Sequence, residues 1–158
     1  MRYILILLLN VMLFGDSYDF YEYKFVFGVN QEFKKSGNIS VDANKTIITY
    51  SKPKYKQIIL NDGNVSIEGS SGKIYKLKGK ALFYTKLFID VMTRVDDIDE
   101  LKTNRDFDVI RDGDLYKLSF NGEIEDQIPK AEVKTKDSKV LSFKLFMHNN
   151  DTLEIVKR

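Results

Sequence analysis

The sequence offers few side chains whose type and spacing could support catalysis. Its single histidine, His148, stands beside Asn149 and Asn150 in a polar stretch typical of a turn. The chain has no cysteine, which excludes thiolate nucleophiles, disulfides, cysteine-ligated metal sites and a lipid-modified cysteine. A serine triad needs a histidine base, and most zinc sites need several His or Cys ligands. We therefore interpret His148 as a solvated turn residue rather than a ligand or a base.

Carboxylates form two clusters, and both have structural explanations. The cluster at positions 96–100 lies where a helix is predicted to begin, and the helix dipole favours negative charge there. The cluster at positions 106–114 brackets a turn at Asp112-Gly113, where both residue types are common. Neither has the spacing of a calcium-binding loop, no glycine-rich phosphate loop is present, and nothing marks an acid–base pair. We predict that the protein is not an enzyme and uses no metal or cofactor.

Length and charge set the broad class. The 158 residues suit one domain, and 25 basic and 23 acidic residues spread along the chain give a net charge of +2. Without a basic patch, a nucleic-acid partner is not expected.

The N-terminus reads as a targeting segment. Arg2 supplies a positive charge, Ile4–Phe14 is an apolar core, and Gly15 and Ser17 have the small-residue spacing of a cleavage site. The apolar run is shorter than the ~20 residues that span a bilayer. We predict a signal peptide at residues 1–17 and a single exported domain at residues 18–158.

Most of the remaining chain is predicted to form strands. Apolar and polar residues alternate from Tyr21 to Phe33, which predicts one long, half-buried strand. Further strands are expected near 39–41, 46–50, 55–60, 65–68, 73–77, 105–111, 114–120, 130–136, 140–147 and 152–156. Short connections favour antiparallel neighbours. So many strands in a short chain should curl into a barrel-like sheet rather than lie flat. We therefore predict a mainly β (α+β) fold of about eleven antiparallel strands in a curved sheet.

The stretch Gly79–Asn104 is the long segment with a helical period. Apolar residues recur at three- and four-residue steps from Ala81 to Val95, and a cap pattern at Asp97 predicts a break near Asp96 into two helices. Two interpretations remain open from the pattern alone. The helix is either a lid over a curved sheet or an ordinary core helix of an α+β domain.

Turn residues carry a resemblance to a known family. The order is Phe33, then Gly37-Asn38-Ile39-Ser40-Val41, then Tyr50-Ser51-Lys52-Pro53, then Ile58-Ile59-Leu60-Asn61-Asp62-Gly63. This order, followed by a helical insert and five strands, resembles the outer-membrane lipoprotein carriers, the LolA family. The resemblance spans the predicted domain, and its motifs are short. Where the family has an Arg that holds its lid closed, this chain has Ala43, with Lys45 nearby.

The resemblance implies an incomplete antiparallel barrel of about eleven strands covered by a helical lid, and a non-catalytic carrier in the periplasm of a Gram-negative bacterium. We expect it to act as a monomer. Its cavity would hold the acyl chains of lipoproteins or other lipids between an inner-membrane lipoprotein-releasing transporter and an outer-membrane acceptor. The family's outer-membrane receptor is itself a lipoprotein, so the lack of cysteine favours a shuttle. The alternative is a non-catalytic structural or adaptor protein of the envelope that uses the same curved sheet for protein–protein contacts.

Candidate residues for the hydrophobic cavity follow from alternation in the strands and from the helix stripe. From the strands they are Tyr23, Phe25, Phe27, Ile39, Val41, Val65, Ile67, Leu141, Phe143 and Leu145. From the helix they are Leu82, Phe83, Leu87, Phe88, Val91 and Met92. For each of them, a place in a closed, ligand-free core is the competing interpretation.

Overall fold

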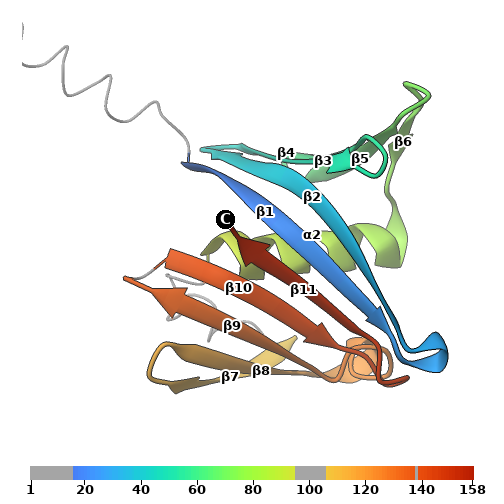
Figure 1. Cartoon of the computed structure of the whole chain (residues 1–158). Coiled ribbons are helices and arrows are strands. Elements are labelled where there is room, and N and C mark those ends of the chain that lie inside the picture. Colours follow the sequence, from blue (N-terminus) through green and yellow to red (C-terminus); the bar gives the residue numbers. More distant parts are fainter. Residues whose placement is uncertain (1–15, 95–105, 138) are drawn as a thin grey trace, which may run out of the picture.

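The computed structural model describes residues 16–94, 106–137 and 139–158, with the side chains of residues 16, 91, 92 and 94 outside that description. One helix, α2 (Gly79–Arg94), lies against one antiparallel sheet, and short 3-10 helices form at η1 (Phe27–Val29) and η2 (Gly122–Ile124) (Figure 1). The strands are β1 (Asp16–Val26), β2 (Gln31–Asp42), β3 (Lys45–Lys52), β4 (Lys56–Asn61), β5 (Asn64–Gly69), β6 (Ile74–Lys76), β7 (Phe107–Asp112), β8 (Leu115–Phe120), β9 (Lys130–Lys136), β10 (Lys139–Phe146) and β11 (Thr152–Lys157).

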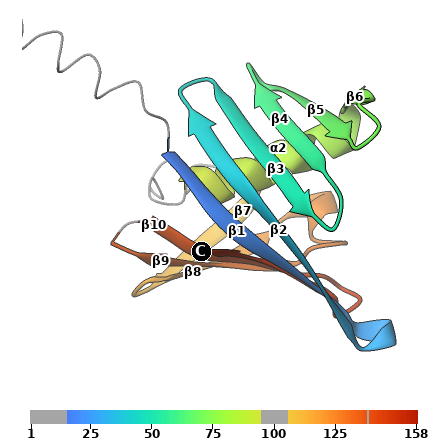
Figure 2. The same ribbon diagram turned by 45° about the horizontal axis from the view of Figure 1, so that its top comes forward.

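The sheet consists of two arms joined in the middle. Its order is β6-β5-β4-β3-β2-β1-β11-β10-β9-β8-β7, so every neighbouring pair is consecutive in sequence except β1 and β11, and β6 and β7 form the two edges. We call β1–β6 the N-terminal arm and β7–β11 the C-terminal arm. The arms diverge, and α2 crosses the concave side between them, in contact with β5 and β10 (Figure 2). The predicted fold class, an open eleven-stranded antiparallel sheet with a helical cover, is thereby confirmed.

The predicted strand from Tyr21 to Phe33 is wrong in one respect, because the chain reverses direction inside it. Phe27–Val29 forms η1, and Asn30 follows in the left-handed region with φ 50°. The backbone N–H of Phe27 donates to Oδ1 of Asp151 at 2.8 Å, which fixes the reversal against the β10–β11 turn. Asn tolerates positive φ better than most residues, so β1 and β2 form a hairpin. Alternation continues on both sides of this turn, which hid it from a periodicity argument.

A register shift lies within β2, near its middle. β2 runs through this stretch, and its pairing with β3 slips between Ser36 and Gly37. A Cβ at Gly37 would lie 2.7 Å from Cζ of Phe20, so glycine is required by a close approach. The ring of Phe20 then reaches Tyr50, with an edge-on contact at 5.4 Å between centroids.

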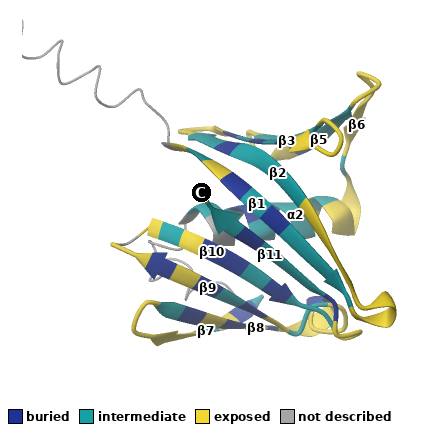
Figure 3. Ribbon diagram, in the orientation of Figure 1, coloured by how far each residue is buried: buried dark blue, intermediate teal, exposed yellow. Residues whose placement is uncertain are grey.

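The main core lies between α2 and the C-terminal arm. Phe88 of α2 contacts Phe120 and Phe143 with centroid separations of 5.9 and 6.3 Å. Phe120 also contacts Phe107 at 5.9 Å, and such offset or edge-on arrangements are favourable. The burial colouring is darkest along β8 to β10 and paler along β4 to β6 (Figure 3). The two arms are therefore covered to different extents.

The helix prediction is confirmed over Gly79–Arg94. The predicted break near Asp96 and the second helix lie outside the described residues, as does most of the predicted signal peptide. Leu87 and Ile89 are both buried although they point to different sides of the helix. Both sides of α2 are therefore covered, as expected for a helix that lies between two arms of a sheet.

Candidate functional site: the concave face and its covering helix

The strand register defines rows of side chains on the concave face of the N-terminal arm. Directly paired residues in an antiparallel sheet point to the same face. The row nearest α2 comprises Thr46, Leu60 and Val65, because Thr46 pairs with Leu60 and Leu60 pairs with Val65. We call it the helix row. Two residues further along the strands lies the isoleucine row, which comprises Ile39, Ile48, Ile58 and Ile67.

Burial falls along these rows from the centre of the sheet toward its edge. Ile39 and Ile48 are buried, whereas Ile58, Leu60 and Ile67 keep part of their surface accessible. Among the described residues of β4, β5 and β6, Val65 is the apolar side chain that is fully buried, at 1% exposure. The concave face therefore presents accessible aliphatic surface beside α2, while the C-terminal arm presents little.

A cluster of polar side chains lies beyond the isoleucine row, and we call it the polar end. It comprises Tyr50 and Lys56, two residues beyond that row, and the pair Glu22 and Lys35, with Lys35 four residues from Ile39. Glu22 is only 4% exposed, and its two oxygens accept from Nζ of Lys35 at 3.0 Å and from the hydroxyl of Tyr50 at 2.5 Å. Nζ of Lys56 lies 4.8 Å from the centroid of the Tyr50 ring.

Burial and charge shift the ionisation of the polar end. Burial raises the pKa of Tyr50, and the Glu22 carboxylate adds to this because a second negative charge nearby is unfavourable. The pKa of Lys56 is lowered, first by burial and then by the positive charge of Lys35, while Glu22 opposes the change. The arrangement concentrates two cations and one carboxylate at the border of an apolar surface.

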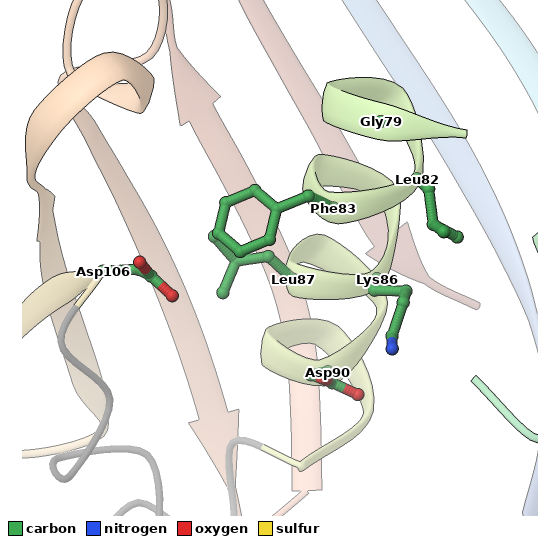
Figure 4. Close-up of a pocket in the computed structure, with 7 residues that line it drawn as sticks. All are labelled: Gly79, Leu82, Phe83, Lys86, Leu87, Asp90 and Asp106. Atoms are coloured by element: carbon green, nitrogen blue, oxygen red, sulfur yellow. The ribbon is translucent and has the colours of Figure 1, made fainter. Parts of the chain in front are cut away.

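Two hollows flank α2 on the side of the C-terminal arm. One, of about 320 Å³, is lined by Gly79, Leu82, Phe83, Lys86, Leu87, Asp90 and Asp106 (Figure 4). In this view Phe83 and Leu87 point from α2 toward the segment that carries Asp106. The second, of about 410 Å³, lies beside the first helical turn and η2, and Phe83 lines it too. Phe83 is 43% exposed between the two hollows.

The structure places part of the predicted cavity set together. Ile39, Val41, Val65, Ile67, Phe143 and Leu145 lie on the concave face, where Ile39, Val65, Phe143 and Leu145 are buried. Leu82, Phe83 and Leu87 line a hollow beside α2, and Phe88 packs on the C-terminal arm. Val91 and Met92 lie in α2, but their side chains are outside the description. Whether any of these residues binds a ligand stays a prediction.

Four predicted residues lie elsewhere. Tyr23 and Phe25 pair with Glu154 and Thr152 on the convex face, opposite to the face expected for them. Phe27 is in η1 and is 57% exposed. Leu141 falls where the β9–β10 register shifts between Val140 and Ser142, so it leaves the face shared by Phe143 and Leu145.

The face expected for β1 was wrong because a polar residue occupies its concave side. Glu22 lies there between Phe20 and Lys24, so the larger run of aromatic residues belongs to the convex side. On the convex side Tyr21 and Tyr23 are covered by a cation, since Nζ of Lys34 lies 3.7 and 5.3 Å from their ring centroids. The alternation of aromatic residues thus correctly predicted β structure here, but it assigned Tyr23 and Phe25 to the wrong face of the sheet.

Several residues of the concave face were missed from the sequence. Ile58 and Leu60 flank Ile59 in an unbroken apolar run, which has no alternation to assign a face. Ile89 falls outside the helix stripe that was used to define the lid. Tyr50 and Lys56 belong to this face because they pair with each other across β3 and β4, and that pairing is known only from the strand register.

Together these features define a class of fold: an open, curved antiparallel sheet of eleven strands with one helix across its concave side. No protein-family model and no curated protein matches the chain. Solved structures do resemble it, at low sequence identity.

Three of these structures span nearly the whole chain. An outer membrane lipoprotein-sorting protein domain from Vibrio parahaemolyticus has a TM-score of 0.47 and 9% identity, with 90% of this chain and 83% of that chain covered. A LolA superfamily protein from Nitrosomonas europaea has a TM-score of 0.44 and 8% identity, with 92% and 84% covered. A DUF1329 family protein from Desulfovibrio piger has a TM-score of 0.45 and 9% identity, with 99% and 89% covered. These are distant likenesses of fold, and no function is taken from them.

Within residues 16–94, 106–137 and 139–158, no helix has both the length and the apolar character needed to cross a membrane. The same residues contain no group of three or more His, Cys, Asp or Glu side chains placed to hold a metal ion.

Proposed function

We propose that the protein is a non-catalytic carrier that binds the acyl chains of a lipoprotein or another lipid between its concave face and α2. The observation that carries this proposal is the accessible apolar surface of Ile58, Leu60 and Ile67 beside the helix. A protein that needed this surface only for its own core would be expected to cover it as fully as it covers the C-terminal arm.

The energetics favour an apolar ligand at this place. Removing apolar surface from water contributes about 25 cal/mol per Å², so half-covered isoleucines gain stability when a chain covers them. The two hollows on the other side of α2, toward the C-terminal arm, are separate from this surface, and their volumes of about 320 and 410 Å³ are within the range of roughly 300–1,000 Å³ typical of ligand sites. A helix that bridges two arms can uncover such a site by a small displacement.

The sequence resemblance supports a particular setting for this activity. In that setting the protein is exported to the periplasm, acts as a monomer, receives its cargo from an inner-membrane lipoprotein-releasing transporter and delivers it to an outer-membrane acceptor. The short turn motifs from Phe33 to Val65 carry the resemblance. These partners are part of the proposal and are to be tested separately from lipid binding.

Two neighbouring isoleucines of β4 provide a matched test. Ile58 pairs with Ile48 and Ile67 on the concave face, whereas Ile59 pairs with Ile47 and Ser66 on the convex face, and both are half-buried. A fluorescent acyl probe is titrated into the parent, Ile58→Gln and Ile59→Gln, with denaturant unfolding of the same samples. We expect Ile58→Gln to weaken probe binding about tenfold, since burying an amide without a partner costs about 1–3 kcal/mol. Ile59→Gln should bind like the parent.

The outcome separates a carrier from a closed domain. Equal losses in both variants would mean that binding follows stability rather than the concave face. Absence of probe binding in the parent, together with no lipid in native mass spectra of the purified protein, would overturn the proposal. If a glutamine variant does not fold, the pair Ile58→Ala and Ile59→Ala makes the same comparison with a smaller change.

An envelope adaptor remains the second candidate because of one feature of the sheet. β7 is the edge strand at one end of the described sheet, and Ile110 on it is 67% exposed. An unpaired edge can accept a strand from another protein. Ile110→Lys should abolish partner recovery in crosslinking experiments if the adaptor function is correct, and it should leave acyl-probe binding unchanged if the carrier function is correct.

A further inference from the structure

The polar end contains a cation whose charge is not balanced by its neighbours. Both carboxylate oxygens of Glu22 are already engaged, one by Lys35 and the other by Tyr50. Lys56 makes no ion pair with any residue that the structure describes, and it is half-buried beside the Tyr50 ring. The cluster thus carries one positive charge more than negative ones.

The surroundings of Lys56 leave room for another group. Its partner on β3 is Tyr50, but its partner on β5 is Gly69, which has no side chain. A Cβ placed on Gly69 would meet nothing within 4 Å, so the space beside Lys56 on that side is open. Lys35, the second cation, keeps a side-chain exposure of 39% although it is bonded to Glu22. Both ammonium groups can therefore be reached from solvent.

The position of this cluster relative to the isoleucine row is set by the register. Lys56 lies two residues from Ile58 on the same strand and the same face, a separation of about 7 Å along the strand. Gly69 lies two residues from Ile67 in the same way. Apolar surface and excess positive charge are therefore adjacent on one face, which matches the shape of a lipid whose charged group ends its chains.

We propose that the polar end binds the anionic phosphate headgroup of the lipid whose acyl chains lie along the isoleucine row, with Lys56 as the principal contact and Lys35 as the second. This inference rests on the proposed lipid-carrier function. Ammonium groups bind phosphate as point charges, and a partly desolvated site strengthens the attraction. Selectivity for an anionic over a zwitterionic headgroup is the property that the site adds to acyl-chain binding.

The test compares two amphiphiles that have the same chain. Dodecyl phosphate and dodecylphosphocholine are titrated below their critical micelle concentrations at low ionic strength. We expect the parent to bind dodecyl phosphate about tenfold more tightly, and we expect this preference to shrink at high salt because the ammonium groups are partly exposed. Lys56→Gln should remove the preference, because it should weaken binding of dodecyl phosphate far more than binding of dodecylphosphocholine, whose phosphate is already balanced by its own ammonium group. Lys54→Gln, the same charge change at an exposed position two residues away, should keep it.

Each result bears on a different part of the proposal. Equal binding of the two amphiphiles by the parent would overturn the headgroup site and leave the carrier function standing. Binding of neither would overturn both. Inorganic phosphate that binds the parent as tightly as dodecyl phosphate would assign the site to free phosphate instead of a lipid. Lys56→Met, which keeps an apolar stem against Tyr50, repeats the test if Lys56→Gln is unstable, and a retained preference in either variant would also refute the assignment.

Discussion

Gly37 lies where β2 brings its backbone close to an aromatic ring of the concave face. The ring of Phe20 occupies the space above it and contacts Tyr50, which in turn holds Glu22. The absence of a side chain at Gly37 therefore leaves room for the Phe20 ring, which packs against Tyr50 of the polar end. Glycine is needed here for space, because its φ is not in the positive region.

Gly37→Ala is expected to destabilise the fold by about 1–3 kcal/mol, the usual cost of overpacking. The new methyl would lie 2.7 Å from Cζ of Phe20 and against the backbone of β3, which cannot move easily. Gly28→Ala is the control, because a Cβ at Gly28 would meet nothing within 4 Å. Chemical denaturation measures both variants, and a Gly37→Ala protein as stable as Gly28→Ala would contradict the packing argument.

Tyr18 is expected to make stability depend on alkaline pH. Burial raises the pKa of Tyr18 from 10.0 to about 12 in the folded protein. The stabilisation is complete below pH 10, where the phenol is protonated in both states. It is lost as pH rises from 10 to about 12, because the unfolded chain releases its proton first.

The difference between the parent and Tyr18→Phe isolates this effect. We expect the parent to lose up to about 1.4 kcal/mol per pH unit relative to Tyr18→Phe between pH 10 and 12. The other titrating groups cancel in the difference. Urea unfolding at several alkaline pH values measures it, and parallel stability curves for the two proteins would refute the assignment.

At the level of single residues, the sequence predicted the positions of some apolar side chains but not the burial of Glu22. The concave positions of Ile39 and Val65 followed from alternation, but a buried Glu22 does not follow from it, because a carboxylate is normally assigned to solvent. Its burial depends on Tyr50 and Lys35, which reach it from neighbouring strands. Such pairing is determined by register, and the register is not visible in the local pattern.

At the scale of elements, α2 combines two kinds of aromatic side chain. Phe88 packs edge-on against Phe120 on the C-terminal arm, whereas Phe83 stays exposed between two hollows. One therefore holds the helix in place, and the other is available to a ligand.

Truncating each ring should separate these roles. Phe88→Ala is expected to cost about 3 kcal/mol, near the lower end of values for buried aromatic residues, because its ring is only partly covered. Phe83→Ala should cost less than about 1 kcal/mol and should weaken acyl-probe binding at least threefold. Thermal unfolding and probe titration on the same preparations measure both effects. Comparable stability losses, with binding unchanged in Phe83→Ala, would show that the hollows do not hold the ligand.

Most elements were predictable because their boundaries contain strong turn signals. Asp62-Gly63 lies between β4 and β5, and Gly113 follows Asp112 at the end of β7, so both turn signals fall at strand boundaries, and both glycines have positive φ. The η1 reversal was not predicted, because it is fixed by Asp151 from the other end of the chain. The register shift at Leu141 was not predicted for a similar reason, since a bulge is defined only by the pairing with the partner strand, here β9.

At the scale of the whole molecule, the N-terminal boundary of the domain remains a prediction. β1 begins at Asp16, and Asp16 and Ser17 pair with Val41 and Ser40. Cleavage after Ser17 would remove only these two residues from β1 and would keep Phe20 and Glu22 in place.

We expect mass spectrometry of protein recovered from the periplasm to give an N-terminus at or near Tyr18. The small residues Gly15 and Ser17 are the reason, since signal peptidase sites require them. An intact Met1 in a membrane fraction that resists alkaline extraction would instead indicate an anchored protein.

The β1–β11 pair has a consequence for the order in which the chain folds. Every other neighbouring pair in the sheet is consecutive in sequence and can form as a local hairpin. β1 meets β11 only after the whole chain is available, and pairings between distant segments form slowly because a long loop must close. Until β11 has been made and can pair, the edge of β1 that faces away from β2 therefore stays unpaired. That interval is when the nascent chain is most exposed to pairing with another copy of itself.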